Sequence, residues 1–460
     1  MDRRDHRLGL RRRLVAVVVA MSAATALCGG CEQPTHDNID HWLRTARGPD
    51  KLREALADST LAADLRAHAA QNLIARNELA DVVATFEAMA GPERASVLAV
   101  LAPRLWADAR ISGALTKPTA EQTEAKDALF ELRRFAEAAE CELIDGYLID
   151  WLTGGYYVGR ARAGRVLGPT ILRAVGPAAS PKMQTAVAAV VDAPARADGS
   201  RLAIEGELLV GLAATGSPEA VGYLLELVDR GDRDPELPQR AMRALYTAFV
   251  DPGQRFPPAP GQALVPHLGA LSARALDRDL STAMQDDLIA LIAAAGPPGC
   301  ITALVPLVGA RRQPEMVRWV SANAALRCGR AQALVPVAEA LPPQAEYDAG
   351  KLAGVIWEPM EALAEPEVVA AQARLLLGSE SWVARVIGVE LLGRVAAPGS
   401  AAEDAQRVRA LGRDRTVLRG WWGDQRDLPR AQRRPLPRLG DRARDVADRL
   451  DRLAKSRRKT

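Results

Sequence analysis

The feature that most constrains the fold is an alternation, sustained over residues 45–400, of Ala-, Leu- and Val-rich segments with short Gly/Pro turns. Within the segments, apolar residues recur at helical spacing. One helix face is predicted to carry Leu65, Ala69, Ala70 and Leu73. Sustained period-two alternation, the pattern of a half-buried strand, does not occur, and aromatic residues make up only 4% of the chain. The sequence therefore predicts an all-α protein.

Many of these segments share a pattern: a hydrophobic–Arg pair, an Ala-rich stretch, a turn and a Leu/Val-rich stretch. The pairs end at Arg66, Arg318 and Arg385. The pattern resembles the HEAT and armadillo-like repeats, in which each unit is a pair of antiparallel helices. The resemblance implies a HEAT-like α-solenoid, a superhelix of stacked helix pairs, over residues 45–400. The three arginines are expected to bridge neighbouring turns or to cap helix C-termini rather than to bind a partner.

The turns are spaced roughly as such repeats require. Gly216 and Gly296 open turns 80 residues apart, which is two units of 40, whereas Gly329 follows Gly296 after 33. HEAT arrays repeat at about 40–47 residues, so the second interval is a shorter unit. Residues 288–310 are uncharged over a membrane-spanning length, but the Gly/Pro turn at 296–299 breaks any helix there. Two packed helices are predicted instead.

The N-terminus has the composition of a signal peptide. Residues 1–13 contain six Arg, and residues 14–27 form a charge-free apolar core. That core has the length of a signal-peptide h-region and is too short to span a bilayer comfortably.

The end of this segment resembles the lipobox of bacterial lipoproteins. Gly29 and Gly30 precede Cys31 as two small residues precede the modified Cys of a lipobox, although Cys28 stands where Leu is usual. The resemblance implies that residues 1–30 are removed and that Cys31 carries a lipid. It places the protein in the bacterial cell envelope, anchored to a membrane and facing the periplasm. Cleavage without a lipid and an uncleaved anchor remain as alternatives.

Residues 31–44 are polar, show no periodic apolar pattern and are predicted to be a tether that ends in the first helix cap. Possible metal ligands within it are His36, Asp37, Asp40 and His41. Metal ligands must be held rigidly on converging elements, which a tether does not provide, so no metal site is expected.

The last 60 residues, 401–460, contain 18 Lys and Arg against nine Asp and Glu, whereas residues 31–400 contain 36 against 46. Trp421 and Trp422 lie between two glycines. Either both plug the end of the solenoid as a cap, which is the favoured interpretation, or one faces the core and the other solvent. Residues 441–454 are predicted to form a charged helix, followed by a solvated basic tail.

Cys141, Cys300 and Cys328 are the thiols that remain after the predicted cleavage and lipidation. Three widely spaced Cys make neither a disulfide framework nor a zinc site. Cys300 and Cys328 either pair across neighbouring helices or stay buried as small apolar residues, and the second interpretation is favoured.

The densest aromatic and basic cluster in the body is the candidate binding surface, made of Trp151, Tyr156, Tyr157 and Arg160. The glycines around it are spaced as in a phosphate loop, but the Lys and Ser/Thr of such a loop are missing. The segment itself is interpreted as a helix and turn with aromatic packing. As a surface it would suit a peptide or polysaccharide rather than a nucleotide.

Together these features predict a membrane-anchored periplasmic scaffold that binds a protein partner, without catalytic activity, cofactor or small-molecule substrate. The acidic body argues against nucleic acid as a partner. One alternative is an enzyme built on the α-solenoid, in which a polar pocket gathers His68 or His267 with acids and Arg. The other is a polyanion binder that acts through the basic C-terminal tail.

Overall fold

The regular elements are helices throughout the part of the chain that the computed structural model describes. That part comprises residues 33–111, 117–193, 204–230, 234–253, 255–277, 279–425 and 428–457. The all-α prediction is therefore confirmed for these residues. The predicted signal peptide, 1–30, and the predicted lipidation site, Cys31, lie outside them. Packing divides the chain between Val166 and Leu167 into unit 1 and unit 2, a division that the single array predicted over 45–400 does not contain.

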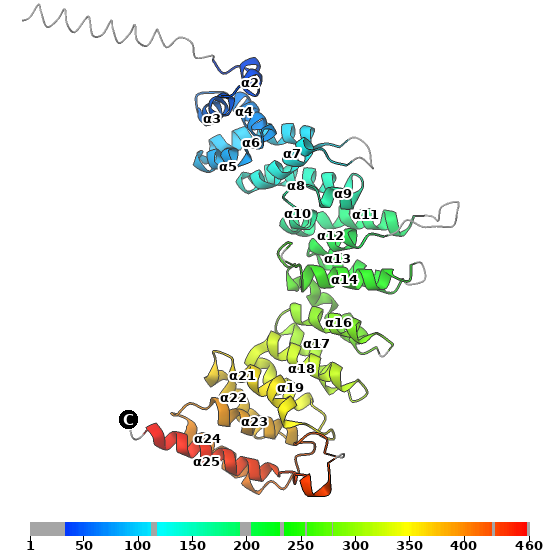
Figure 1. Cartoon of the computed structure of the whole chain (residues 1–460), viewed down its shortest axis with the longest axis vertical. Helices are drawn as coiled ribbons and strands as arrows, with labels where there is room; N and C mark the ends of the chain where they lie inside the picture. The colour runs from blue at the N-terminus through cyan, green and yellow to red at the C-terminus, as the bar shows by residue number, and fades with distance from the viewer. Residues whose placement is uncertain are drawn as a thin grey trace, which may run out of the picture. The chain divides into compact units, whose positions relative to one another are not determined.

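Unit 1 places its helices so that alternate ones pack together, as α4 does with α2 and α6, and α6 does with α8 (Figure 1). Its elements are α2 (His36–Trp42), α3 (Gly48–Ala57), α4 (Ala63–Ala75), α5 (Leu79–Ala88), α6 (Gly91–Ala109), α7 (Ala120–Leu132), the 3-10 turn η1 (Arg133–Phe135), α8 (Ala138–Thr153) and α9 (Tyr157–Ala161). Fully buried side chains from successive helices fill the core, among them Leu56, Leu73, Leu98, Leu129 and Leu148.

The tether predicted for residues 31–44 is wrong for residues 36–42, which form α2. The Thr35 side chain accepts a hydrogen bond from the Asn38 backbone N–H and so caps the helix. Ile39 and Trp42, one turn apart, are buried against α3 and α4. The sequence did not predict this helix, because two apolar residues are too few to form a periodic pattern. The helices that bury them, α3 and α4, come later in the chain.

A buried ion pair on α7 closes the C-terminal end of unit 1. Lys126 and Asp127 are 0% and 1% exposed, and they form a salt bridge with each other. The Lys126 Nζ also donates to the carbonyl oxygens of Ala163, at 2.9 Å, and Val166, at 2.6 Å. The Asp127 carboxylate accepts the backbone N–H groups of Arg165, at 2.7 Å, and Val166, at 3.2 Å. The two side chains together therefore provide hydrogen-bond partners for the backbone of the turn that follows α9.

Gly164 makes this close approach possible. Its φ of +85° lies in the left-handed region, which favours glycine. A Cβ at this position would lie 2.6 Å from a carboxylate oxygen of Asp127. The turn thus needs a residue without a side chain at 164.

Unit 2 contains α10 (Gly168–Val175), η2 (Gly176–Ala179), α11 (Ser180–Val191), α12 (Gly206–Ala214), α13 (Pro218–Val228), α14 (Leu237–Phe249), η3 (Gly261–His267), α15 (Leu268–Ala275), α16 (Thr282–Ala294), α17 (Gly299–Gly309), α18 (Glu315–Gly329), η4 (Arg330–Ala333), α19 (Leu334–Ala340), α20 (Ala349–Leu352), the π-helical turn η5 (Ala353–Trp357), α21 (Glu358–Glu361), α22 (Pro366–Leu376), α23 (Trp382–Val395), α24 (Ala401–Ala410), η6 (Leu411–Arg413), η7 (Arg430–Gln432) and α25 (Leu439–Arg457).

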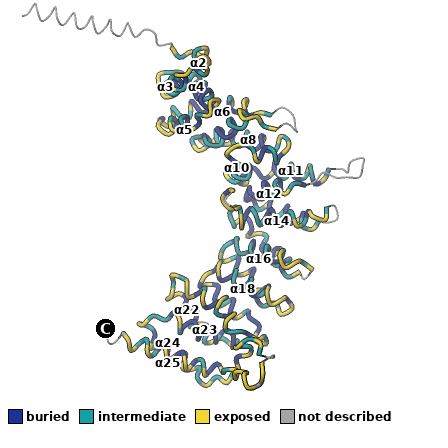
Figure 2. The backbone as a smooth tube through the Cα atoms, viewed as in Figure 1, coloured by how far each residue is buried: buried dark blue, intermediate teal, exposed yellow. Residues whose placement is uncertain are grey.

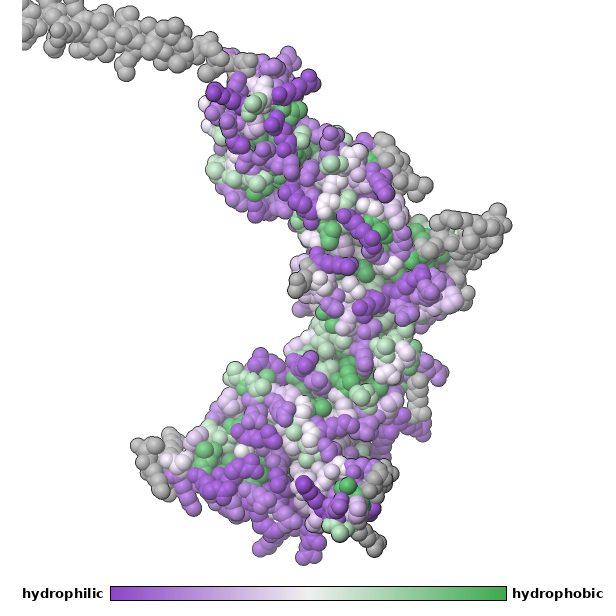
Figure 3. All heavy atoms as spheres, viewed as in Figure 1, coloured by the Kyte–Doolittle hydropathy of each residue, from purple (hydrophilic) through white to green (hydrophobic). Residues whose placement is uncertain are grey.

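These helices pack in two rows. The first row runs through α10, α12, α14, α16 and α18, each packed on the next, and α15, α17 and α19 follow one another in the second. Figure 2 shows buried residues where the helices meet and exposed residues at the turns. In Figure 3 hydrophilic residues cover most of the visible face, with hydrophobic ones at the surface around α16 and α17.

The expected role of the repeated arginines is confirmed for two of the three. Arg66 donates from Nε to the carbonyl oxygen of Leu56, in the last turn of α3, at 2.8 Å. Arg385 donates from Nη1 to the carbonyl oxygens of Ser379 and Glu380, in the turn before α23, both at 2.9 Å. The prediction is not confirmed for Arg318, whose buried Nε has no hydrogen-bond partner among the described residues.

Residues 288–310 belong to two helices, α16 and α17, as predicted, and the Pro297-Pro298 turn separates them. In the described ranges no helix combines the length and apolar character needed to cross a membrane.

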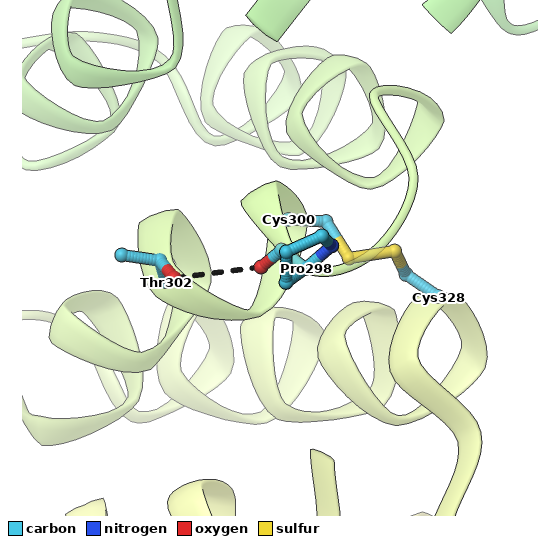
Figure 4. Close-up of a disulfide and its surroundings, with 4 residues drawn as sticks. All are labelled: Pro298, Cys300, Thr302 and Cys328. Carbon is cyan, nitrogen blue, oxygen red and sulfur yellow. Dashed lines mark hydrogen bonds between the residues drawn. A yellow bond between two sulfur atoms is a disulfide. The ribbon is translucent and has the colours of Figure 1, made fainter. Parts of the chain in front are cut away.

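The interpretation of Cys300 and Cys328 as two buried thiols is wrong, because they form a disulfide (Figure 4). Cys300 lies in the first turn of α17 and Cys328 in the last turn of α18, and their Cα atoms are 6.7 Å apart. The two helices approach closely here, since a Cβ on Gly329 would lie 2.5 Å from the Ile301 side chain. The two Cys are 28 residues apart in the chain. They meet because α17 and α18 are antiparallel, so the end of α18 lies beside the start of α17.

The predicted cap and tail of residues 401–460 are a folded part of unit 2 through Arg457. α25 packs on α24 and α23, and the predicted charged helix is thus held by a buried stripe that includes Val446 and Leu450. Trp421 is 3% exposed and Trp422 is 39% exposed. The favoured interpretation of both Trp as a buried plug is therefore wrong, and the alternative of one Trp inside and one outside is what the structure shows.

Candidate functional site

The aromatic and basic cluster predicted as a binding surface is mostly inside unit 1. Trp151, Tyr157 and Arg160 are 1%, 6% and 4% exposed, and only Tyr156, at 44%, reaches solvent. The Trp151 indole Nε1 donates to the carbonyl oxygen of Ala109 at 3.1 Å. These four residues therefore do not form an exposed binding surface.

Arg160 holds the turn after α8 in place. Its Nη1 donates to the carbonyl oxygen of Trp151 at 2.7 Å. Burial lowers the pKa of the Arg160 guanidinium, because the charged form loses hydration that one carbonyl does not replace. Lys126 Nζ lies 5.3 Å from the centre of the Trp151 ring, so the aromatic side chain also covers the buried ion pair. The aromatic and basic residues therefore do lie together, but they serve the internal packing of unit 1.

Two histidines that are 32 residues apart in the chain meet at the N-terminal end of unit 1. His36 on α2 and His68 on α4 face each other with their Nδ1 atoms 2.8 Å apart. Each ring uses its other nitrogen on a carboxylate: His36 Nε2 lies 2.8 Å from Asp64, and His68 Nε2 lies 2.7 Å from Asp40. Arg104 on α6 also pairs with Asp64.

The protons of this network follow from its geometry. An ionised carboxylate only accepts hydrogen bonds, so both Nε2 atoms carry a hydrogen. The contact between the Nδ1 atoms is then a hydrogen bond only when one ring holds a second proton. These side-chain contacts join α2 to α4. In the described ranges, no group of three or more His, Cys, Asp or Glu converges where it could hold a metal ion.

His267, the other histidine of the predicted body, belongs to unit 2 and has different partners. Its Nε2 lies 2.8 Å from the carbonyl oxygen of Pro218, at the start of α13. The ring packs against Gly222, where a Cβ would lie 3.1 Å from the ring carbon Cε1. His68 and His267 are thus each engaged separately, one in a charged network and one against helix backbone.

A groove of about 620 Å³ lies in unit 2, where α13, α14, α15 and α16 meet. We call it the unit 2 groove. It is lined by Val228, Asp229, Met242, Ala270, Ala273, Arg274, Asp277, Leu280, Met284 and Leu288. Its volume lies within the range of about 300–1,000 Å³ that is common for ligand sites.

The groove has an apolar floor and a charged rim. Met242 and Met284 face it from α14 and α16, and methionine side chains adapt to ligands of different shape. On the rim, Arg274 makes two hydrogen bonds to the Asp229 carboxylate, at 2.7 and 2.6 Å. Arg274 also donates to the carbonyl oxygen of Leu225 at 3.2 Å, so the guanidinium is fixed in position.

Sequence reasoning missed this groove. Met242, Met284 and Leu288 occupy apolar positions that look like ordinary core positions when each helix is considered alone. The groove exists because the small Ala270 and Ala273 are exposed on α15 beside them. The spacing of apolar residues within one helix does not show which of them will border a groove once the neighbouring helices are packed.

No protein-family model matches this chain, and no curated protein is significantly similar to it in sequence.

Proposed function

We propose that the protein is a lipid-anchored scaffold of the bacterial cell envelope that holds a peptide segment of a protein partner in the unit 2 groove. The observation that carries the proposal is the groove itself, with its adaptable apolar floor and fixed rim of both charge signs. Interfaces with proteins combine such an apolar centre with a polar rim. An amphipathic segment would place its apolar face on the floor.

Two further observations support this proposal. The two rows of helices in unit 2 are the packing expected of a HEAT-like solenoid, in which each helix pair stacks on the next. The Cys300–Cys328 disulfide fits an oxidising compartment, such as the periplasm that the N-terminal segment implies. The proposal assigns no catalytic step to the protein.

Blocking the groove tests the binding role. Ala273 is exposed on α15, so Ala273→Trp places a large ring in the groove without entering the core. We expect it to weaken partner binding about tenfold or more, since a loss of about 1.4 kcal/mol corresponds to tenfold. A photo-crosslinking residue at position 270 in living cells reports occupancy, and captured peptides are then titrated against the purified protein.

Ala402→Trp is the matched control, because Ala402 is an exposed alanine on α24, away from the groove. It should leave crosslinking and affinity unchanged. Equal losses in both variants, or crosslinks at 270 that Ala273→Trp leaves intact, would rule out the groove as the binding site.

The anchor is tested by Cys31→Ala. This variant removes the thiol that accepts the lipid, so we expect it to lose metabolic palmitate labelling and to move from the membrane fraction to the soluble fraction. Cys28→Ala, three residues earlier, should retain both labelling and membrane association. Labelling that persists in the Cys31 variant would contradict the anchor.

A further inference from the structure

Large apolar side chains gather at the surface of one segment near the C-terminus. Ten large apolar residues in the described chain are exposed, and four of them lie within a stretch of 20 residues. These four are Val417, Trp422, Leu428 and Leu436, each between 39% and 43% exposed. We call the described residues 417–425 and 428–438 the Arg–Trp loop. Figure 1 shows it as the orange to red segment next to the N-terminal end of α25.

The base of the loop is fixed to the body of unit 2. Val417 and Arg438 form an antiparallel bridge, and the Leu418 N–H donates to the carbonyl oxygen of Pro437 at 3.0 Å. Leu418 and Trp421 point inward and are 0% and 3% exposed. The outward position of Trp422 therefore follows from a firmly packed neighbour and not from a loose chain end.

Hydrogen bonds within the loop hold its exposed side chains in place. The Trp422 indole Nε1 donates to the carbonyl oxygen of Pro435 at 3.0 Å. The side chain of Gln425 accepts the Arg434 N–H at 2.7 Å, and Arg433 Nε donates to the carbonyl oxygen of Leu428 at 2.9 Å. Since the indole N–H already has an acceptor, the rest of the ring can enter an apolar medium without leaving a donor unsatisfied.

The loop also carries excess positive charge. Its residues, 417–425 and 428–438, include five Arg and one Asp. The Arg434 guanidinium lies 5.4 Å from the centre of the exposed Trp422 ring, so a cation and an aromatic ring are presented together. Basic and aromatic side chains in combination are characteristic of protein segments that lie at the membrane–water interface.

We propose that the Arg–Trp loop binds the surface of a membrane that contains anionic lipid, with its arginines on the headgroup phosphates and Trp422, Leu428 and Leu436 in the interfacial layer. Pro429, Pro435 and Pro437 lack N–H groups, which disfavours the addition of a partner β-strand. A second membrane contact at this loop depends neither on the groove nor on the lipid at Cys31.

The test uses the full mature chain with Cys31→Ser, so that no lipid anchor contributes. It is mixed with phosphatidylcholine vesicles with or without phosphatidylglycerol, and binding is measured by flotation and by quenching of tryptophan fluorescence with brominated lipid. We expect binding only to the anionic vesicles, with an affinity that falls as salt rises. Trp422→Ser should weaken binding about tenfold, and Arg433→Gln/Arg434→Gln about 25-fold, at roughly fivefold per arginine.

Matched controls separate the loop from general surface properties. Leu375→Ser removes the most exposed of the ten apolar residues, and Arg311→Gln/Arg327→Gln removes the same net charge from exposed positions elsewhere in unit 2. Both should bind vesicles like the parent, and circular dichroism melts check that every variant is folded.

Three results would overturn the proposal: no binding to anionic vesicles, equal losses in the loop and control variants, or binding to soluble polyglutamate that vesicles do not compete. The last result would assign the loop to an acidic protein partner instead.

Discussion

Replacing Asp127 with alanine is expected to lower the free energy of unfolding of unit 1 by about 3–5 kcal/mol, because the change leaves the Lys126 ammonium buried without its counter-ion. Burial already lowers the pKa of Lys126, an effect that Asp127 partly offsets. The variant also removes the acceptor for the Arg165 and Val166 N–H groups. Domains are stable by only about 5–15 kcal/mol, so this is a large fraction of the total.

Differential scanning calorimetry of the full chain, with hydrogen exchange to assign the transition, measures this effect. We expect the melting temperature of unit 1 to fall by about 10–20 °C and protection to be lost first in α7 and the turn after α9. Glu121→Ala, at an exposed position on the same helix, should change little.

The double variant Lys126→Met/Asp127→Asn distinguishes charge from packing. It removes both charges, while the Asn oxygen still accepts a backbone N–H, so it should be more stable than Asp127→Ala. Replacement of a buried ion pair by neutral groups of similar volume is often tolerated. If the double variant is as unstable as the single one, the buried charge is not the cause of the loss.

Removal of the Cys300–Cys328 disulfide is expected to lower the stability of unit 2 by about 3–4 kcal/mol. The bond closes a loop with a sequence separation of 28, between the values of about 3 kcal/mol for 15 residues and 4.7 kcal/mol for 100 in the chain-entropy model. The loop contains almost all of α17 and α18. The loss should therefore appear first as faster hydrogen exchange in these two helices.

Urea unfolding of the Cys300→Ala/Cys328→Ala variant, and of the parent with and without reductant, measures this loss. Cys141→Ala is the control, since Cys141 is the free cysteine of the described chain. Reductant should destabilise the parent and leave the double variant unchanged. Equal unfolding midpoints for parent and double variant would show that the bond contributes nothing to stability.

The sequence predicted best what depends on neighbouring residues. The two helices within residues 288–310 were predictable, because Pro297 and Pro298 cannot continue a helix and the flanking apolar residues have helical spacing. The contacts of Arg66 and Arg385 with preceding turns were predictable from the repeated pattern in which they occur.

The features that the sequence did not reveal depend on contacts between distant residues. The sequence shows two Cys 28 residues apart, but the disulfide requires the close packing of α17 on α18. Trp151 looks like a surface anchor until the carbonyl group of Ala109, 42 residues earlier, accepts its N–H. The unit 2 groove needs four helices before it exists. The binding surface predicted from the sequence failed for the same reason, because three of its four residues are buried by contacts with distant parts of unit 1. The kind of partner stays a prediction.

The two rows of helices in unit 2 have a consequence for how the chain folds. Because α12 packs on α14 and α14 on α16, each helix finds its partners within a short stretch of sequence. Local contacts of this kind carry a small loop-closure cost and allow folding to begin at one end and propagate. A chain threaded through a translocation pore with its N-terminus first can bury α12 against α14 before α18 emerges. Unit 2 is thus suited to fold progressively from its N-terminal end, as export of the kind proposed above would require.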